Sequence, residues 1–576
     1  MCTSWRRLSS LQRLILLLGL LFCCLVAFTV LPRYFSASDS QGLPAVREPL
    51  QDSLPSGPKL SQIDSIEEHQ RNLDALKKQA SLLQAEIDQN EKREENLQAN
   101  LQLNLPFKGG YDFFNGQTRT ERQEQVVEAF KHAWKAYKKY AWGHDELHPI
   151  SKTSSEWFNT GLTLVDSLDT IIIMGLKEEY EEAKEWVKKS LDFRVNSFVN
   201  LFEITIRILG SLLSTYHLTG DEIMKEKAIE LGKRLLPAFN PRSKIPYSDI
   251  NLDKGYAKAP RWGPDSSTAE VATIQLEFRD LAFISGNRKF EEVVHEVAMH
   301  IHEAEKANGL VPIFVNANTG KFRASGTITL GARGDSYYEY LLKQWIQSDK
   351  KLTQFKTDFE ESYQGVKSKL VRRSEPNKLL FIGELLAGRN FSPKMDHLVC
   401  FYAGTLALAH HYGLGEGEEY LDTAKDLGET CWQMYNRMPT KLSPEITYFN
   451  MAKGAKEDLI VKPLDSHNLL RPETVESLFY LYRFTGDQKY RDQGWQIFLA
   501  FEKHTKLKDG GYSSIANVKD AGNPRFKDKM ESFFLSETLK YLYLLFSDDP
   551  NLMNLDTWVF NTEGHPLPIL KDGVEP

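Results

Sequence analysis

Apolar residues recur with the 3.6-residue spacing of α-helices from about residue 110 to residue 569. The strict alternation of apolar and polar positions that predicts half-buried strands is scarce in the same region. In three places an apolar helix stops at a glycine, and an Asp or Asn follows that can cap the next helix. Antiparallel helix pairs joined by such short turns predict an all-α toroid. The three segments read STYHLTGDEI, RDLAFISGNRKF and LYRFTGDQKY.

An uninterrupted apolar run at residues 14–31 follows Arg6, Arg7 and Arg13. Its length is about the minimum for a helix that crosses a bilayer. The basic residues before it predict a cytoplasmic N-terminus and a lumenal body. We therefore expect a cytoplasmic tail at residues 1–13 and a type II signal-anchor at residues 14–31. A cleaved signal peptide is the alternative, because small residues follow the run.

Residues 32–109 predict a linker followed by a helical stalk. Residues 36–58 are rich in Ser, Pro and Gly, which is typical of a linker. From about 61 to 105, apolar residues recur at three- and four-residue spacings among polar ones. Self-association through a weak coiled coil is one interpretation of this stalk, and a single solvated helix is the other. The large helical body is expected at residues 110–576.

Composition narrows the possible partners. The chain has 576 residues, of which 41% are hydrophobic and 26% are charged, with a formal net charge of −7. These values are ordinary for a globular protein, and the mild acidity argues against a nucleic-acid-binding surface. Cys400 and Cys431 are the only cysteines beyond the apolar run. In an oxidising lumen they most simply form one disulfide.

Charged residues interrupt several of the most apolar helical segments. NLFEITIRILG places Glu203 and Arg207 four residues apart, where little water-facing surface is left. An ordinary helical ion pair is one interpretation. A functional site is the other, because a buried pair adds little stability. Similar intrusions are Glu270 in SSTAEVATIQLEF, Arg333, Asp335 and Glu339 in GARGDSYYEYLLK, Asp396 and His397 in KMDHLVCF, and Phe533 and Glu537 in MESFFLSETLKYLYLLF.

The segment RPETVES begins at Arg471 and predicts a helix start, because proline is tolerated in the first turn. Glu473 and Glu476 then share one helix face. Acidic residues suit a helix N-terminus, which explains this segment taken alone. Together with the other intrusions, it predicts a cavity lined by carboxylates, arginines and aromatic rings, which suits a polyhydroxylated ligand. Two carboxylates on opposite sides of such a cavity are the minimum for glycoside hydrolysis.

Seven segments, in order, resemble the class I α-1,2-mannosidases, glycoside hydrolase family 47. The resemblance covers residues 110–569. It implies an (α/α)7 barrel that removes terminal α-1,2-linked mannose from high-mannose N-glycans, with inversion at the anomeric carbon and a requirement for Ca²⁺. The segments are NLFEITIRILG, SSTAEVATIQLEF, GARGDSYYEYLLKQW, MDHLVCF, RPETVESLFYLYR, SFFLSETLKYLYLLF and VFNTEGHPLPI.

The resemblance also implies roles for individual residues. Glu203 matches the general acid, Glu473 the base that activates water, and Asp335 a third carboxylate that positions water or shares the acid's role. Which of Glu203 and Asp335 delivers the proton stays open. Inverting geometry would set acid and base roughly 6.5–9.5 Å apart. Thr562 matches the calcium ligand, and oxygen ligands suit this hard cation. Substrate-binding positions are matched by Arg207, Glu270, Arg333, His397, Arg471, Glu476, Phe533, Glu537 and Glu563.

Within the family, Arg333 and Asp396 resemble the endoplasmic-reticulum type, which converts nine-mannose glycans to eight-mannose glycans in glycoprotein quality control. We therefore expect a membrane protein of the early secretory pathway, in the endoplasmic reticulum, with the Golgi as the alternative. Cys400 and Cys431 match the disulfide of the true mannosidases. The rival functions are a Golgi-type mannosidase of broader branch specificity and a non-catalytic mannose-binding lectin. Asn390 begins a glycosylation sequon whose occupancy the sequence leaves open.

Overall fold

The computed structural model describes most of the chain beyond residue 110. In it, no helix combines the length and the apolarity that crossing a bilayer requires. The apolar run 14–31 and the expected linker at 36–58 lie outside the described residues, so both stay predictions. The described residues are 77, 78, 81, 84, 111–115, 118–239, 241–260 and 263–571.

The chain divides into two compact units, Met1–Asp88 and Gln89–Pro576. The described residues of the first unit, at 77, 78, 81 and 84, are helical and exposed. They fall within the expected stalk, and whether the stalk self-associates stays open. The helical body lies in the second unit.

Long helices of the second unit pack in pairs of unequal burial. Helix α14 (Asp335–Gln347) is buried from its second residue to its end. The outer helix α7 (Lys177–Ser190) buries only Tyr180, Ala183 and Val187, as a surface helix with one apolar stripe does. The pairs, inner helix first, are α6 (Leu168–Ile173) with α7, α9 (Gly210–Thr219) with α10 (Glu222–Leu235), α12 (Gln275–Ser285) with α13 (Lys289–Glu303), α14 with α15 (Thr353–Gly365), α16 (Phe401–His411) with α17 (Glu419–Asn436), α18 (Glu473–Thr485) with α19 (Gln488–His504), and α20 (Leu539–Leu545) with α4 (Glu121–Ala141).

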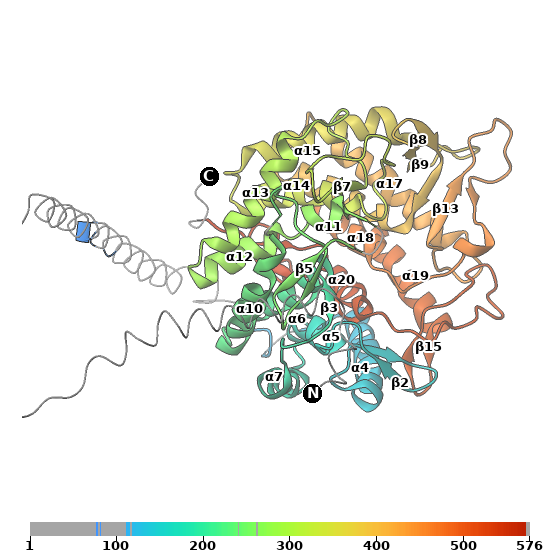
Figure 1. The fold of residues 1–576 in the computed structure, drawn as a ribbon. Helices are drawn as coiled ribbons and strands as arrows, with labels where there is room; N and C mark the ends of the chain where they lie inside the picture. The colour runs from blue at the N-terminus through green and yellow to red at the C-terminus, as the bar shows by residue number, and fades with distance from the viewer. Residues whose placement is uncertain are drawn as a thin grey trace, which may run out of the picture. The chain divides into compact units, whose positions relative to one another are not determined.

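The inner helices contact one another in a closed ring. The contacts run from α6 to α9, α12, α14, α16, α18 and α20, and then from α20 back to α6. Helix α4 near the start of the body and α20 near its end form one pair, so the two ends of the body close the ring. Figure 1 shows this closure, with α20 in red beside α4 in blue. Over the described residues, the predicted all-α toroid is therefore present as seven helix pairs.

The glycines that end three predicted helices are confirmed. Gly220, Gly286 and Gly486 follow α9, α12 and α18 with φ of 75°, 69° and 68°. Glycine adopts this left-handed conformation without the steric cost that a Cβ atom adds.

The capping predictions hold in part. The side chains of Asp487 and Asn287 each accept a hydrogen bond from the first turn of the helix that follows, α19 and α13. Asp221 precedes α10 but makes no side-chain hydrogen bond to that helix's backbone.

Short antiparallel strands fill the connections between the helices. With two to four residues each, they are too short to leave a period of two in the sequence, which is why the pattern did not predict them. Four of them lead directly into helices or turns of the cavity: β3 (Phe198–Asn200), β6 (Asp265–Ser267), β12 (Lys394–Asp396) and β17 (Trp558–Phe560). The others are β1 (Glu146–His148), β2 (Thr153–Ser155), β4 (Asp249–Asn251), β5 (Tyr256–Lys258), β7 (Phe314–Asn316), β8 (Val371–Arg373), β9 (Leu380–Ile382), β10 (Glu384–Leu386), β11 (Asn390–Ser392), β13 (Ile446–Phe449), β14 (Leu459–Ile460), β15 (Lys506–Leu507), β16 (Gly511–Tyr512) and β18 (Pro566–Pro568).

Several short helical segments complete the body. Two of the three π-helices among the described residues, η1 (Thr205–Leu209) and η6 (Phe534–Thr538), each continue directly into an inner helix, α9 and α20 respectively. Such i→i+5 windings are frequent at functional sites. The remaining segments are α5 (Leu162–Asp166), α8 (Leu201–Ile204), α11 (Thr268–Ala272), η2 (Leu236–Phe239), η3 (Val366–Leu370), η4 (His397–Cys400) and η5 (Pro463–Asp465).

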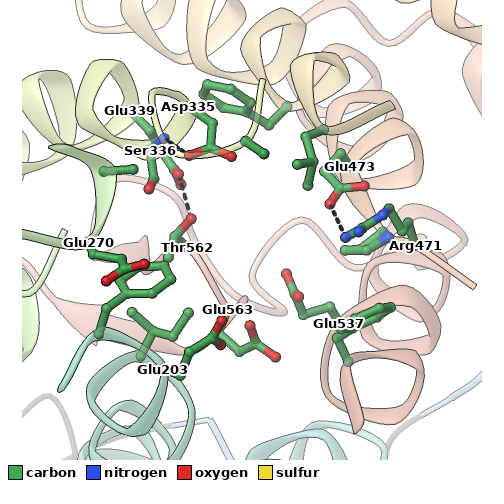
Figure 2. Close-up of a pocket in the computed structure, with 18 of the residues that line it drawn as sticks. Glu203, Glu270, Asp335, Ser336, Glu339, Arg471, Glu473, Glu537, Thr562 and Glu563 are labelled. Atoms are coloured by element: carbon green, nitrogen blue, oxygen red, sulfur yellow. Dashed lines mark hydrogen bonds and ion pairs between the residues drawn. The ribbon is translucent and has the colours of Figure 1, made fainter. Parts of the chain in front are cut away.

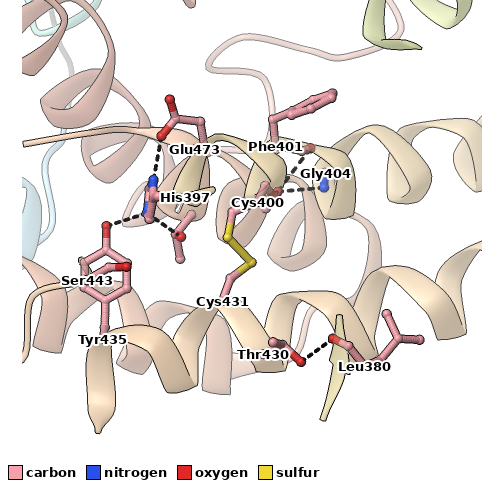
Figure 3. The surroundings of a disulfide bond; sticks show 12 residues. Leu380, His397, Cys400, Phe401, Gly404, Thr430, Cys431, Tyr435, Ser443 and Glu473 are labelled. Carbon is pink, nitrogen blue, oxygen red and sulfur yellow. Dashed lines mark hydrogen bonds and ion pairs between the residues drawn. A yellow bond between two sulfur atoms is a disulfide. The ribbon is translucent and has the colours of Figure 1, made fainter. Parts of the chain in front are cut away.

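A disulfide joins Cys400 at the end of η4 to Cys431 in α17, with an S–S distance of 2.10 Å. It therefore links the start of the inner helix α16 to its outer partner (Figure 3). Both sulfur-bearing residues are fully buried.

Candidate active site

A cavity of about 290 Å³ lies where the inner helices converge. The structure brings twelve of the thirteen predicted catalytic, substrate-binding and metal residues into its lining. The thirteenth, His397, lies behind the lining and contacts Glu473. Figure 2 places Glu203 and Glu473 on opposite sides of the cavity. The twelve are Glu203, Arg207, Glu270, Arg333, Asp335, Arg471, Glu473, Glu476, Phe533, Glu537, Thr562 and Glu563.

Glu203 projects from the first turn of α8, and its position is set by the preceding strand. Asn200 at the end of β3 caps the helix by accepting a hydrogen bond from the Glu203 backbone N at 3.0 Å. The same side chain donates to Glu270 Oε2 at 3.2 Å. Arg207, one turn later in η1, donates from Nε to Glu203 Oε2 at 2.9 Å and also pairs with Glu563. The expected ion pair of Glu203 and Arg207 therefore exists, and it faces the cavity.

Glu473 lies at the opposite wall, at the first residue of α18. Its Oε2 is 2.7 Å from His397 Nδ1, and its Oε1 is 3.6 Å from Arg471 Nη1. Arg471 is in turn held by Glu445, with 2.6 Å from Nε to Oε2. Burial alone would raise the pKa of Glu473, but the hydrogen bond with His397 and the charge of Arg471 lower it. Glu473 is therefore a carboxylate that stays ionised, as a general base requires.

Asp335 begins α14 between those two walls, and its pKa is shifted in the opposite direction to that of Glu473. Its Oδ1 accepts a hydrogen bond from the Ser336 backbone N at 2.9 Å. Burial raises its pKa to about 7, and the charges of Glu339, Asp396 and Glu473 act in the same direction. A carboxyl group with such a pKa retains its proton near neutral pH, as a general acid requires.

The cavity lining holds more acidic than basic side chains. It includes eight carboxyl groups and three arginines. Burial raises the pKa of Glu270 to about 7 and raises the pKa of Glu476, Glu537 and Glu563 well above the ordinary value. Carboxylates crowded in this way are costly unless protonated or matched by cations. The site is thus prepared for a cation, for hydroxyl donors, or for both.

The oxygen donors around Thr562 suit a hard cation. Thr562 follows β17 on the turn at 561–565, and its hydroxyl donates to Glu339 Oε2 at 2.8 Å. Among the described residues no group of three or more His, Cys, Asp or Glu side chains is arranged to chelate a metal. Oxygen donors at a carboxylate-rich cavity, without a closed protein cage, fit Ca²⁺ that keeps water or ligand oxygens in its shell.

Of the two residues that resemble the endoplasmic-reticulum type, Arg333 lines the cavity and Asp396 contacts the neighbouring lining residue Ala332. Arg333 is exposed, has φ of 74°, and places its guanidinium 5.3 Å from the centre of the Phe314 ring. Positive φ is uncommon for a residue that has a side chain, and residues with this conformation cluster at functional sites. Asp396 Oδ1 pairs with Lys394 Nζ at 2.7 Å, and its Oδ2 accepts from the Ala332 backbone N at 3.3 Å.

Several supporting residues were not predicted from the sequence. Lys343 is fully buried and donates to Glu339 Oε1 at 2.5 Å, so it holds the partner of Thr562. The only sign of this ion pair in the sequence was the position of Lys343, one helical turn after Glu339. Behind Arg207 and Glu563 lies a fully buried group whose members come from three segments, so spacing could not reveal it. The group consists of Asp166, Asp169, Lys540 and His565.

Comparisons with known proteins agree with the geometry. A family model described as glycosyl hydrolase family 47 matches residues 129–569. An endoplasmic reticulum mannosyl-oligosaccharide 1,2-alpha-mannosidase of Mus musculus is 60% identical over 451 residues, which cover 78% of this chain and 68% of that protein. A mannosyl-oligosaccharide 1,2-alpha-mannosidase of Arabidopsis thaliana is 48% identical over 500 residues, covering 78% and 80% respectively. A solved alpha-1,2-mannosidase from Trichoderma reesei has a TM-score of 0.73 and 26% identity, covering 79% of this chain and 100% of that one.

Proposed function

This chain belongs to glycosyl hydrolase family 47, and on that premise we propose that it removes terminal α-1,2-linked mannose from high-mannose N-glycans. The observation that carries the proposal is the pair of carboxyl groups of opposite character, Asp335 and Glu473, in one cavity with Glu203. The relatives named above are 1,2-alpha-mannosidases, which supports the same substrate linkage. A lectin would have no need for an ionised carboxylate facing a protonated one.

The proposed reaction is a single displacement with inversion. Glu473 accepts a proton from a water molecule, whose oxygen attacks the anomeric carbon while the bond to the leaving oxygen breaks. An acid on the far side donates a proton to that oxygen. His397 and Arg471 keep Glu473 ionised, and Phe533 offers an aromatic face to the sugar. The other carboxylates and Arg207 are the proposed hydroxyl-binding groups.

The identity of the acid has a testable consequence. Asp335 holds a proton near neutral pH, whereas Glu203 is engaged by Arg207. If Asp335 delivers the proton, kcat/KM should fall as pH rises through about 7, because the acid then loses its proton. That falling limb should persist in Glu203→Gln at a lower rate and should disappear in Asp335→Asn. A falling limb that persists in Asp335→Asn and vanishes in Glu203→Gln would instead make Glu203 the donor.

Calcium is part of the proposal, with Thr562 as its protein ligand. Bound Ca²⁺ would supply positive charge to the acidic cavity and coordinate sugar hydroxyls. Glu339 orients the Thr562 hydroxyl, and Lys343 fixes Glu339. The proposal of Ca²⁺ rests on the oxygen donors around Thr562 and on the excess of acidic over basic side chains in the cavity lining.

The finer assignment is a type II membrane protein of the endoplasmic reticulum that converts nine-mannose to eight-mannose glycans. The mouse relative's name supports the endoplasmic reticulum. The apolar run 14–31 after three arginines supports the type II anchor, and Arg333 and Asp396 support the branch preference. A broader, Golgi-type branch specificity is the second candidate, because two relatives at 40–42% identity carry 1,2-alpha-mannosidase names that do not include the endoplasmic reticulum.

Incubating the full chain with a nine-mannose glycan and Ca²⁺ tests the substrate proposal. We expect release of one mannose and one dominant eight-mannose isomer, because a rim built around one branch orients the glycan in one way. Chromatographic separation of the isomers provides the measurement. A mixture of branch isomers would favour the Golgi-type specificity, and glycan binding without mannose release would favour the lectin.

A further inference from the structure

Tyr435 is a buried residue of the outer helix α17, and it reaches the proposed base through one side chain. Its hydroxyl is 2.9 Å from His397 Nε2, and the two rings meet edge to face with centroids 5.5 Å apart. His397 Nδ1 is 2.7 Å from Glu473 Oε2. Figure 3 shows Tyr435, His397 and Glu473 in this line, beside the disulfide.

The partners of His397 define its tautomer. A carboxylate only accepts hydrogen bonds, so Nδ1, which faces Glu473, carries the hydrogen. Nε2 faces two hydroxyl groups, of Tyr435 and of Thr474 at 3.0 Å, and both can donate to its lone pair. The other tautomer would aim the Nδ1 lone pair at the carboxylate, which is repulsive.

We propose that Tyr435 is a positioning residue of this enzyme, whose hydroxyl locks His397 in the tautomer that donates to Glu473. The inference rests on the hydrolysis proposed above and adds a residue of the outer helix ring to it. The Cys400–Cys431 disulfide holds the two halves of this contact together. Cys400 ends the same η4 segment that His397 begins, and Cys431 lies one helical turn before Tyr435 in α17.

The pKa of Glu473 also depends on the other ionisable groups around it. The lowered pKa of Glu473 is achieved against burial by His397 and Arg471. Three further acidic groups line the cavity near Glu473, one of them on the same helix, and the charge of Glu473 helps to raise the pKa of each; Arg471 is shared with Glu445. Since the acidic groups outnumber the cations, the hydrogen bond from His397 is not redundant. The three acidic groups are Asp335 on α14, Glu476 on α18 and Glu537 on η6.

The test is Tyr435→Phe in the full chain, which removes one hydroxyl and keeps the ring. We expect kcat for mannose release to fall roughly 10- to 100-fold, as for other partners that orient an active-site histidine, with KM changed less than about twofold. The midpoint of the rising limb of kcat/KM should move to higher pH. The direction of this shift follows from the chemistry of Glu473, because a weaker hydrogen bond to its charged form raises the pKa of its carboxyl group.

Tyr402→Phe is the matched control. Tyr402 is also fully buried, on α16, but its hydroxyl has no hydrogen-bond partner among the described residues. The control should keep the wild-type rate and pH midpoint. A lower rate in Tyr435→Phe with an unmoved midpoint, or equal behaviour of the two variants, would overturn the proposal.

A second measurement reads the hydrogen position on His397 directly in the wild-type chain. Nitrogen NMR of the full chain labelled at histidine reports the tautomer of His397, and its signal is assigned by loss in His397→Asn. We expect hydrogen on Nδ1, and hydrogen on Nε2 would overturn the proposal. Failure of the wild-type chain to release mannose would count against the proposed function alone, because the tautomer can be read without turnover.

Discussion

Replacing Glu473 by glutamine should lower kcat for mannose release by about 10³-fold, within the range that general-base removal causes. Glutamine keeps the size of the side chain and can still contact His397 and Arg471, but it cannot accept a proton from water. Glycan affinity should change little, because Glu473 is only one of many polar groups in the cavity. Single-turnover kinetics and direct glycan titration measure the two effects separately.

Glu124→Gln is the matched control for this substitution. Glu124 also lies in the first turn of a helix, α4, and pairs with an arginine, Arg119 at 3.3 Å, but it does not line the cavity. It should retain the wild-type rate. If Glu473→Gln keeps more than about a tenth of the wild-type kcat, the assignment of the base is wrong.

The second large effect concerns calcium. Removing Ca²⁺ with a chelator should abolish mannose release, and restoring Ca²⁺ should recover it. Thr562→Val should weaken Ca²⁺ binding roughly 100-fold, because it removes the side-chain oxygen from a site with few protein ligands. Thermal unfolding gives a readout that does not depend on turnover: Ca²⁺ at 100 times its Kd should stabilise the wild-type chain by about 2.7 kcal/mol.

Thr357→Val is the control for the loss of a threonine hydroxyl. Thr357 lies in α15, where its hydroxyl donates to the Thr353 carbonyl oxygen at 3.2 Å and has no other hydrogen bond within the described part of the chain. This variant should show the wild-type calcium response. Mannose release that continues after thorough chelation would show that the reaction does not need Ca²⁺. The proposed roles of the carboxyl groups would be unaffected.

Much of the fold could be predicted because it depends on local patterns. The inner helices are apolar on nearly every face, and three of them end at glycines whose positive φ a side chain would oppose. The strands and the π-helices could not be predicted in the same way. A three-residue strand shows no period, and one extra residue in a helical turn, as in η1 and η6, is invisible in an otherwise helical pattern.

The cavity lining was predicted because its charges contrast with their apolar surroundings, as Glu203 and Glu476 do, and because whole motifs resemble one family. The residues behind the lining gave no such contrast. Tyr435 is one tyrosine among 23, and only the fold brings it to His397. His565 meets Asp166 and Asp169 from nearly 400 positions away in the chain. Contacts of this kind are set by tertiary packing and leave no spacing in the sequence.

The configuration of the first mannose released tests the central claim most directly. Proton NMR of a nine-mannose glycan mixed with the full chain and Ca²⁺ resolves the two anomers before they equilibrate. A base at Glu473 that activates water opposite the leaving group predicts β-mannose first, from an α-linked substrate. The appearance of α-mannose first would contradict the account.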